Sequence, residues 1–502
     1  MLRRRLSICF AATIACAAQT VSAQVGGLPE EISARQAADA QLENKINAEA
    51  AARSAADTQL QSNINAEAAA RSAVDTQLQN NINAEAAGRS AADTQLQGNI
   101  NAEAAARAAV DAQLQTQIQE LRGGNGGGGT VNVDCASGGS ISQALAAGAG
   151  RVVVRGTCSE SVTISRDDVT LQGDGTVGGR IHGPDADVNT VVITGNRVII
   201  EALTVSGGRN GITGVGASNL TVRNCTVQST GRSGIAYANG ASGTIDGCTV
   251  HSNPRDGIVV DGAYATLINS TVTNNTRNGV GVFNAGSARI GVTDRSAPAG
   301  NTIHQNGASG IGVALGSFVT AAMNQITRNG SFGVSVFQST ASIAGGNTIG
   351  DNSDVGVSVN GSRVVLGDAG LGLSTVNRIS GNGGPGGVVA FLGSSMVIRD
   401  AEIVGNNGAG LLFSLRSQGQ LFSSAIQNNA SDGIRLLLGS ALLPLPAMST
   451  VSGNGGFGIQ CFDAESSVVN TQPPIIALSG NLQGNLSPSC TAFDATPLPP
   501  LP

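Results

Sequence analysis

The sequence predicts an all-β parallel β-helix preceded by a long α-helical coiled-coil stalk, and three observations lead to this fold class. A unit of eighteen residues repeats between Ala34 and Leu121, a run of glycines follows it, and a second, longer repeat then continues towards the C-terminus. Repeats of these lengths indicate structural units that stack on their neighbours rather than a globular core.

The N-terminal segment up to Ala23 has the pattern of a secretory signal peptide. Arg3–Arg5 are basic, Leu6–Ala18 is an apolar run, and small residues end at Ala23. That order predicts export and cleavage after Ala23, since the apolar run is too short to remain as a membrane anchor. Attachment of a lipid at Cys16 is an alternative, although the residues before it fit that signal poorly. We expect a secreted, periplasmic or cell-surface protein.

Composition narrows the possible partners. The net charge is −6, and loss of residues 1–23 would remove three arginines and no acidic residue. A nucleic-acid-binding protein usually has the opposite balance, so no nucleic-acid partner is expected. Lys45 is the only lysine, and the chain has no Trp and two Tyr, which leaves little of the usual signal for sugar stacking.

Residues 24–122 are predicted to form the stalk. Two columns of apolar residues each recur once per repeat, at Leu42, Leu60, Leu78, Leu96 and Leu114 and at Ile46, Ile64, Ile82, Ile100 and Ile118. One repeat makes five helical turns, so each Leu/Ile pair returns to the same helix face. The remaining residues are mostly strong helix formers.

One helix cannot bury such a stripe, so a homo-oligomer with a shared Leu/Ile seam is predicted. A trimer is favoured because the stalk resembles those of trimeric bacterial surface and phage fibres, and a dimer stays open. A flexible Ala/Gln-rich linker is the alternative to a helix. Residues 123–130 are predicted to be a glycine-rich joint.

The second repeat is marked by a glycine that precedes an aliphatic residue. These marker glycines are Gly211, Gly234, Gly257, Gly279, Gly310, Gly333, Gly356, Gly387, Gly410, Gly433 and Gly458. Their spacing is nearly constant, except that the intervals from Gly279 to Gly310 and from Gly356 to Gly387 are longer. The longer intervals are interpreted as ordinary windings with loop insertions around 294–301 and 368–377.

Other positions keep a fixed offset from the marker glycine. Aliphatic residues follow it directly and also precede it by seven residues, which predicts two buried columns. Four residues before it stand Asn253, Asn275, Asn306, Asn329, Asn352, Asn406, Asn429 and Asn454. Asn tolerates the left-handed backbone of a tight turn, and stacked amides can hydrogen-bond along a column, so a structural ladder is expected.

These features resemble the pectin-lyase-like right-handed parallel β-helix superfamily. The resemblance covers residues 131–490, with Val152–Val154, Val162–Ile164 and Val169–Leu171 as first windings, and leaves a Pro-rich tail at 491–502. It implies that Ser140–Leu145 is a short helix that covers the open N-terminal end. The superfamily includes lyases, hydrolases, epimerases, adhesins and tailspikes, so the resemblance predicts fold more than function.

The six cysteines after Ala23 fall into three local pairs. Two pairs bracket the ends of the predicted β-helix, so we expect the disulfides Cys135–Cys158 and Cys461–Cys490. For Cys225 and Cys248, a disulfide and a pair of buried free thiols are equally compatible with the sequence.

Catalysis on this fold needs ionisable side chains that converge on an outer face. At the outward position two residues after the marker glycine, only Arg435 is charged. One winding contains His251, Arg255, Asp256, Asp261 and Tyr264, which are weak candidates for an acid–base site. The motifs typical of polygalacturonases and alginate epimerases in the superfamily are not matched.

Metals and cofactors are not expected. Asp185 and Asp187 are two carboxylates in one loop, which is weak evidence for calcium, and a solvated loop is the favoured interpretation.

Four phenylalanines stand four residues after marker glycines: Phe283, Phe337, Phe391 and Phe462. Strict strand alternation would point them outward as a contact surface. The favoured interpretation is that the strand ends earlier and that the rings turn into the core.

The leading hypothesis from the sequence is therefore an exported structural or adhesive protein, and a role without catalysis is favoured. It would present a β-helix body on a self-associated stalk and could contact extracellular polysaccharide or a cell surface. The alternative is a polysaccharide-modifying lyase, hydrolase or epimerase. A carboxylate-lined outer groove would favour that alternative.

Overall fold

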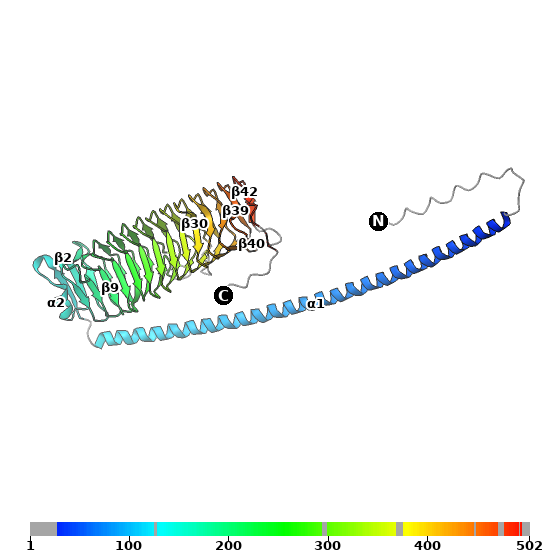
Figure 1. The fold of residues 1–502 in the computed structure, drawn as a ribbon. Coiled ribbons are helices and arrows are strands. Elements are labelled where there is room, and N and C mark those ends of the chain that lie inside the picture. The colour runs from blue at the N-terminus through cyan, green and yellow to red at the C-terminus, as the bar shows by residue number, and fades with distance from the viewer. Residues whose placement is uncertain are drawn as a thin grey trace. The chain divides into compact units, whose positions relative to one another are not determined.

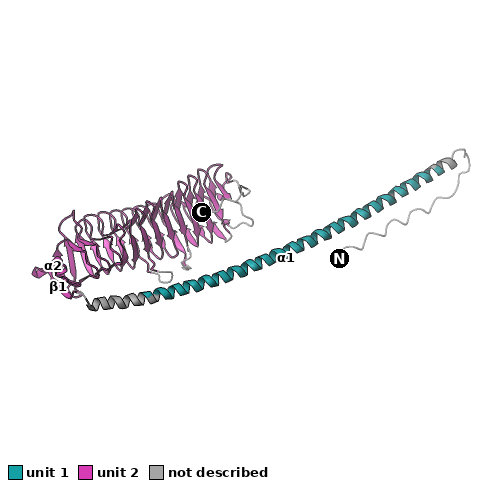
Figure 2. Ribbon diagram, turned by 90° about the horizontal axis from the view of Figure 1, so that it is seen from below, with its two compact units in different colours: residues 1–119 teal, residues 120–502 magenta. Residues whose placement is uncertain are grey.

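The computed structural model describes residues 28–124, 128–293, 299–367, 375–445, 448–469, 476–490 and 492–493. The chain divides into two compact units, residues 1–119 and residues 120–502 (Figure 2). The predicted signal peptide and nearly all of the Pro-rich tail lie outside the described residues. In the described part, no helix is both long and apolar enough to span a membrane.

In its described residues the first unit is one helix, α1 (Leu28–Gly124), which is 97 residues long and ends just after the boundary between the units (Figure 1). Each repeat places the same internal pairs on its surface, such as Arg53 with Glu49 and Arg71 with Glu67, both at 2.8 Å. Such pairs four residues apart support a helix only weakly. The Leu/Ile stripe is uncovered in the single chain, with Leu60 59% exposed and Ile64 53% exposed.

The second unit is a parallel β-solenoid in which every full winding contributes strands to three sheets (Figure 1). We call them sheets A, B and C. One winding runs from β12 (Ile235–Ala238) in sheet C to β13 (Ser242–Asp246) in sheet A and β14 (Thr249–His251) in sheet B. All pairings between windings are parallel, which confirms the predicted parallel β-helix.

Sheet C contains β3 (Val162–Ile164), β6 (Val191–Ile193), β9 (Ile212–Val215), β12, β15 (Ile258–Asp261), β18 (Val280–Phe283), β21 (Ile311–Ala314), β24 (Val334–Phe337), β27 (Val357–Asn360), β30 (Gly386–Phe391), β33 (Ala409–Phe413), β36 (Ile434–Leu436), β39 (Phe457–Cys461) and β42 (Gly484–Leu486). It includes the strands that begin near the marker glycines.

Sheet A contains β1 (Thr130–Asp134), β2 (Arg151–Ser159), β4 (Thr170–Gly173), β7 (Ile199–Glu201), β10 (Leu220–Arg223), β13, β16 (Tyr264–Ile268), β19 (Ser287–Ile290), β22 (Phe318–Ala321), β25 (Thr340–Ile343), β28 (Arg363–Leu366), β31 (Ser395–Arg399), β34 (Gln418–Phe422), β37 (Ala441–Pro444), β40 (Ser467–Val469) and β43 (Ala492–Phe493). Its last strand begins just beyond the predicted domain end at 490.

Sheet B begins with the second half of β2 and continues with β5 (Gly179–Gly183), β8 (Leu203–Gly207), β11 (Thr226–Gln228), β14, β17 (Thr271–Thr273), β20 (Thr302–His304), β23 (Gln325–Thr327), β26 (Thr348–Gly350), β29 (Asn377–Ser380), β32 (Ala401–Val404), β35 (Ala425–Gln427), β38 (Ser449–Ser452) and β41 (Ile476–Ser479). Both longer intervals insert at the same corner, between sheets A and B, before β20 and before β29.

The marker glycine is required by close packing between windings. A Cβ atom on Gly257 would lie 2.6 Å from both the Asn275 side-chain amide nitrogen and a methyl group of Val272, and 2.8 Å from a backbone oxygen. Contacts this short exclude a side chain. The aliphatic residues on both sides are buried, as Ile258 and Val272 show.

The eight predicted asparagines form one buried ladder in which each side-chain amide donates to the carbonyl oxygen of the next. Asn253 donates to Asn275 at 2.8 Å, and the ladder includes Asn382 and ends at Asn481. Thr230 caps it at the other end. These amides also bond backbone groups, which satisfies polar atoms that would otherwise be buried without partners.

A second ladder, absent from the sequence-based expectations, lies at the corner between sheets A and B. Asn301 donates to Asn324, Asn324 to Asn347 and Asn347 to Asn377, at 2.9 to 3.1 Å. Its first and last members stand directly before or at the start of the strands that follow the two insertions. The ladder therefore fixes the corner from which both loops leave the solenoid.

Both ends of the solenoid are stabilised locally. The short helix α2 (Ile141–Ala146) packs on β1, β2 and β3 and buries Ile141 and Ala144. Its N-terminus is bound by the Glu160 carboxylate, which accepts from the Ile141 N–H at 2.7 Å. The disulfides Cys135–Cys158 and Cys461–Cys490 are both present, as predicted, one at each end.

Cys225 and Cys248 are free and buried, which resolves the alternative that the sequence left open. Each thiol faces a backbone carbonyl of the preceding winding, Ile200 and Val222 respectively. The hydrogen bond with Cys248 and burial raise the pKa of Cys225.

Candidate functional site

The weak acid–base candidates from the sequence lie on one winding but on different faces. His251 is on the outer face of sheet B, Arg255 and Asp256 are in the turn to sheet C, and Asp261 ends a strand of sheet C. Tyr264 begins β16 in sheet A. The winding therefore distributes the five residues around its perimeter rather than collecting them at one site.

Asp256 has a structural environment. Only 4% of it is exposed, and its carboxylate accepts from the Asn278 backbone N–H at 3.1 Å and from the Asn278 side chain at 2.7 Å. Asp261 accepts from the Asn284 side chain at 2.6 Å. Both carboxylates thus connect neighbouring windings. Tyr264 lies on the outer face of sheet A, which also carries carboxylate and guanidinium side chains.

That face is the outer side of sheet A between β2 and β19. Register brings Gln172, Glu201, Arg223 and Asp246 into one column, because Gln172 pairs with Glu201, Glu201 with Arg223, and Arg223 with Asp246. Neighbouring positions in a parallel sheet are about 4.8 Å apart. We call these residues, together with Arg151, Tyr264 and Arg289, the sheet A site.

One half of the sheet A site is a hydrogen-bonded network. The Arg151 guanidinium donates to Gln172 at 2.9 Å and to Glu201 at 3.2 Å. Arg223 donates to the other oxygen of Glu201 at 2.7 Å. The Glu201 side chain is only 11% exposed, whereas those of Arg151 and Arg223 are 46% and 48% exposed. A nearly buried carboxylate therefore holds two guanidinium groups in place at the surface.

The other half contains the groups that could move a proton. Asp246 lies next to Arg223 and accepts from the Asn269 side chain at 2.9 Å. Tyr264 is 39% exposed, and its hydroxyl oxygen accepts from Thr266 at 3.3 Å, so the ring lies along the strand. Arg289, one winding further along, lies in register with Thr266. Cations, a carboxylate and a phenol thus share one outer surface.

The sequence could not reveal this site because sheet A has a variable offset from the marker glycine. Tyr264 follows Gly257 by seven residues, whereas Ser242, its partner in register, follows Gly234 by eight. A one-residue change exchanges the inner and outer faces of a strand. Glu201 and Arg151 precede the marker glycines altogether. To find this site from the sequence, the strands of sheet A would have to be aligned with one another by the length of each preceding turn.

The outer face of sheet C fits the expectation of few charged groups. Arg435 pairs with Asp432 at 2.7 Å, and only 2% of the Asp432 side chain is exposed. The guanidinium also lies over the ring of Phe462, 5.4 Å from its centre. This ion pair is internally satisfied, so sheet C offers no carboxylate pair for catalysis in the described residues.

The phenylalanine row faces outward, and the favoured prediction that it turns into the core is wrong. Phe337 is 39% exposed and Phe462 is 53% exposed, while Phe283 and Phe391 are half-buried. All four end strands of sheet C or immediately follow them. Strand alternation continues through this offset, because the chain turns towards sheet A only at the next residue.

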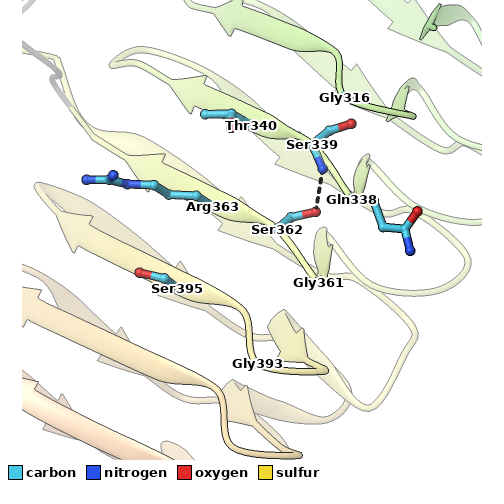
Figure 3. A pocket seen from close by; sticks show the side chains of 9 residues that line it. All are labelled: Gly316, Gln338, Ser339, Thr340, Gly361, Ser362, Arg363, Gly393 and Ser395. Carbon is cyan, nitrogen blue, oxygen red and sulfur yellow. Dashed lines mark hydrogen bonds between the residues drawn. The ribbon is translucent and has the colours of Figure 1, made fainter. Parts of the chain in front are cut away.

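A shallow hollow of about 460 Å³ lies at the corner between sheets C and A. It is lined by turn residues such as Gly316, Gly361 and Gly393 and by Thr340, Arg363 and Ser395, which occupy neighbouring strands (Figure 3). The Ser339 backbone N–H donates to the Ser362 hydroxyl beneath it. Arg363 is its only charged lining residue, so the hollow could hold a polar group but could not supply an acid–base pair.

No group of three His, Cys, Asp or Glu side chains that could hold a metal ion occurs in the described ranges. Asp185 and Asp187 lie in one exposed turn, in which Asp185 accepts from the Asp187 backbone N–H at 2.9 Å. That contact is an ordinary turn hydrogen bond.

Comparison with protein families finds a match to the right handed beta helix region in the segments 115–263, 151–297, 256–368 and 372–472, of which the first three overlap. A search of curated proteins finds no match.

Solved structures with similarity include the A-module of mannuronan C-5 epimerase AlgE6 from Azotobacter vinelandii, at 16% identity and a TM-score of 0.41, covering 74% of this chain and 92% of that one. Others are the catalytic unit of a GH87 alpha-1,3-glucanase from Streptomyces thermodiastaticus (13% identity, TM-score 0.39, 72% and 70% covered) and the periplasmic alginate epimerase AlgG (10% identity, TM-score 0.39, 72% and 84% covered).

Proposed function

This chain belongs to the right-handed β-helix family, and we propose that it binds an acidic polysaccharide on the outer face of sheet A and acts on it there. The fold supplies a long sheet surface and no chemistry of its own. The sheet A site supplies the chemistry. The observation that carries the proposal is the Arg151–Glu201–Arg223 network beside Asp246, with Tyr264 on the same face.

The network suits a ligand that carries carboxylates. Glu201 neutralises only part of the charge of two guanidinium groups, and Arg289 adds a third cation three windings beyond Arg223. Guanidinium groups recognise carboxylates through paired hydrogen bonds, and a preset geometry avoids much of the entropy cost of ordering. A uronic-acid polymer lying along the solenoid axis would meet these cations in succession.

The same groups suit proton abstraction from the carbon next to a uronate carboxyl group. Arginine contacts with that carboxylate would stabilise the negative charge that develops when the proton leaves. Asp246 would take the proton. The Tyr264 hydroxyl would give a proton either to the departing 4-linked sugar oxygen or to the opposite face of the same carbon. Loss of the 4-linked oxygen would make this a lyase reaction, and return of a proton to the other face an epimerase reaction.

Binding of size-defined acidic oligosaccharides tests the proposal. Tetragalacturonate and a neutral tetrasaccharide would be titrated into the wild-type protein and into Arg223→Gln. The expected result is binding of the acidic ligand only, weakened about tenfold in the variant, because a charged hydrogen bond is worth about 1.5–3 kcal/mol. Arg328→Gln, an exposed arginine outside the site, is the control and should bind as the wild type does.

A purely structural or adhesive role, the leading hypothesis from the sequence, has no set of described contacts in its favour. The two disulfides suit an exported protein, because such bonds persist in oxidising compartments. We propose export and leave secretion, a periplasmic location and surface attachment as its three possible outcomes.

We also propose that the chain self-associates through α1, most simply as a trimer. Leu60, Ile64, Leu78 and Ile82 are each more than 50% exposed in the single chain, and a second copy presents the same five-turn period over the same length. Light scattering on the full chain tests this. Replacement of Leu60, Leu78 and Leu96 by Asn should reduce the particle mass to that of one chain, and a wild-type monomer at micromolar concentration would contradict the proposal.

A further inference from the structure

A column of four arginines lies at the corner between sheets B and C. Arg209, Arg232, Arg255 and Arg277 stand two residues before the marker glycines of four consecutive windings. We call them the arginine column. They lie outside the sheet A site, and sequence-based interpretation singled out only Arg255, as a candidate for catalysis.

Backbone hydrogen bonds define the stacking of the column. The Arg255 N–H donates to the Arg232 carbonyl oxygen at 3.0 Å, and the Arg277 N–H donates to the Arg255 carbonyl oxygen at 3.1 Å. Successive arginines therefore follow the rise of the solenoid, about 4.8 Å per winding. Arg209, Arg255 and Arg277 are exposed and Arg232 is half-buried, so the side chains are available to a ligand.

No ion pair within the described residues involves the four arginines of the column. The neighbouring carboxylate of Asp256 is buried and bound to Asn278, and the exposed Asp185 and Asp187 lie at the same corner one winding before Arg209. Repulsion from Arg255, and then from Arg209, lowers the pKa of Arg232. Four stacked like charges oppose folding, so stability alone does not account for them.

We propose that the arginine column binds an anionic polysaccharide that lies along this corner, with successive carboxylates against successive arginines. The rise between windings is close to the length of one sugar unit in an extended polysaccharide. A uronic-acid polymer carries one carboxylate per sugar, so its charge period can match the column without bending the chain. A preformed row of cations also reduces the ordering cost of binding.

The same surface is poorly suited to a nucleic acid. Proteins that hold single strands add aromatic side chains on which bases stack. Around the arginine column the turn residues are Asn210, Ser233, Pro254 and Thr276, which have no aromatic ring.

The arginine column rests on the proposed function, because it would bind the same class of polymer. Binding at the column does not require that the polymer reacts. The column would hold a long polymer on a different corner of the solenoid while the sheet A site engages one stretch of it.

Binding of long polygalacturonate to the full chain tests the proposal. The variant Arg232→Gln/Arg255→Gln removes the two central charges, and its affinity should fall by roughly tenfold or more. Its melting temperature should stay the same or rise, because repulsion is relieved. The control Arg328→Gln/Arg416→Gln loses the same charge from exposed positions elsewhere and should keep its affinity.

Three outcomes would overturn the proposal: equal losses of affinity in the two double variants, unchanged affinity in Arg232→Gln/Arg255→Gln, or tighter binding of single-stranded DNA than of polygalacturonate. Arg223→Gln separates this proposal from the sheet A site. If Arg223→Gln abolishes polymer binding while Arg232→Gln/Arg255→Gln has no effect, the column fails and the sheet A site stands. The reverse result supports the column and counts against the sheet A site.

Discussion

The side chain of Asn275 donates a 2.9 Å hydrogen bond to Asn306, although the winding between them is longer than the one between Asn253 and Asn275. The extra residues leave the solenoid at the corner between sheets A and B, before β20, and the register on both sides is unchanged. The ladder therefore depends on the stacking of windings and is indifferent to loop length. Insertions at that corner can vary without disturbing the register of the ladder.

Interruption of this ladder should be costly. Asn306 is 1% exposed, accepts from Asn275, and donates to Asn329 and to the Val272 carbonyl oxygen at 3.1 Å. Asn306→Ala would leave these buried groups without partners, so we expect a loss of about 3 kcal/mol and a lower melting temperature by circular dichroism. Gln325→Ala, on the exposed outer face of β23, is the control. Equal effects of the two changes would contradict a structural ladder.

Four exposed leucines occupy left-handed backbone conformations at the corner between sheets C and A. Leu392 has φ of 58° and is 54% exposed, and Leu315, Leu415 and Leu438 are similar. Asn, which occupies comparable turns at Asn239 and Asn284, adopts this conformation more readily than Leu. Leu392→Asn should therefore raise stability by about 0.5–1 kcal/mol in thermal unfolding. A loss of stability would show that the leucine makes a contact worth more than the backbone strain.

The pH dependence of stability should include a contribution from Glu160. Burial opposes its ionisation, but hydrogen bonds from the Ser142 side chain, the Ile141 and Ser142 N–H groups and the Ser140 hydroxyl outweigh burial and lower its pKa below the ordinary 4.5. A lowered folded-state pKa gives stability that is present above pH 4.5 and is lost as the pH falls through the folded-state value.

Glu160→Gln should accordingly melt at a lower temperature than the wild type at pH 7, and the difference should shrink below pH 4.5. Glu402→Gln, which removes an exposed ion pair with Arg378, should change little at either pH. A difference that is independent of pH would rule out the carboxylate as its source.

The cysteines should differ in reactivity. In protein from which residues 1–23 have been removed, the native state should show no reactive thiol, because Cys225 and Cys248 are buried, and unfolding without a reductant should release two. Each disulfide should contribute about 3 kcal/mol by the chain-entropy estimate for loops of this size. Thiol titration and non-reducing peptide mapping check both statements, and more than two thiols in the unfolded protein would contradict the pairing.

The repeat made much of the fold predictable. Gly257, Ile258 and Asn275 keep a fixed offset, because close packing, burial and laddering act on every winding alike. The second ladder from Asn301 to Asn377 was missed because its four members occur only between the two insertions. The Phe337 ring was expected to be buried because its strand was thought to end one residue earlier.

The candidate site was much less predictable. Glu201 is separated from Arg223 by a whole winding and from Arg151 by more than one winding, so no local motif connects them. Their contact depends on turn lengths that change by one residue between windings. The positions of charged side chains on sheet A depend on how its strands pair in three dimensions. An alignment of the sequence on the marker glycines does not give that register.

The most direct test of the central claim is the reaction itself. Wild-type protein and Tyr264→Phe would be incubated with polygalacturonate and with polymannuronate in D₂O, and the products followed by proton NMR. We predict deuterium incorporation next to the carboxyl group, or a new double bond, with the wild-type protein, and a rate at least about a hundredfold lower with the variant, as expected for loss of a general acid–base group. Two results would contradict the account. One is that Arg232→Gln/Arg255→Gln still binds these polymers but forms no product from any acidic polysaccharide. The other is that wild type and Tyr264→Phe react at equal rates.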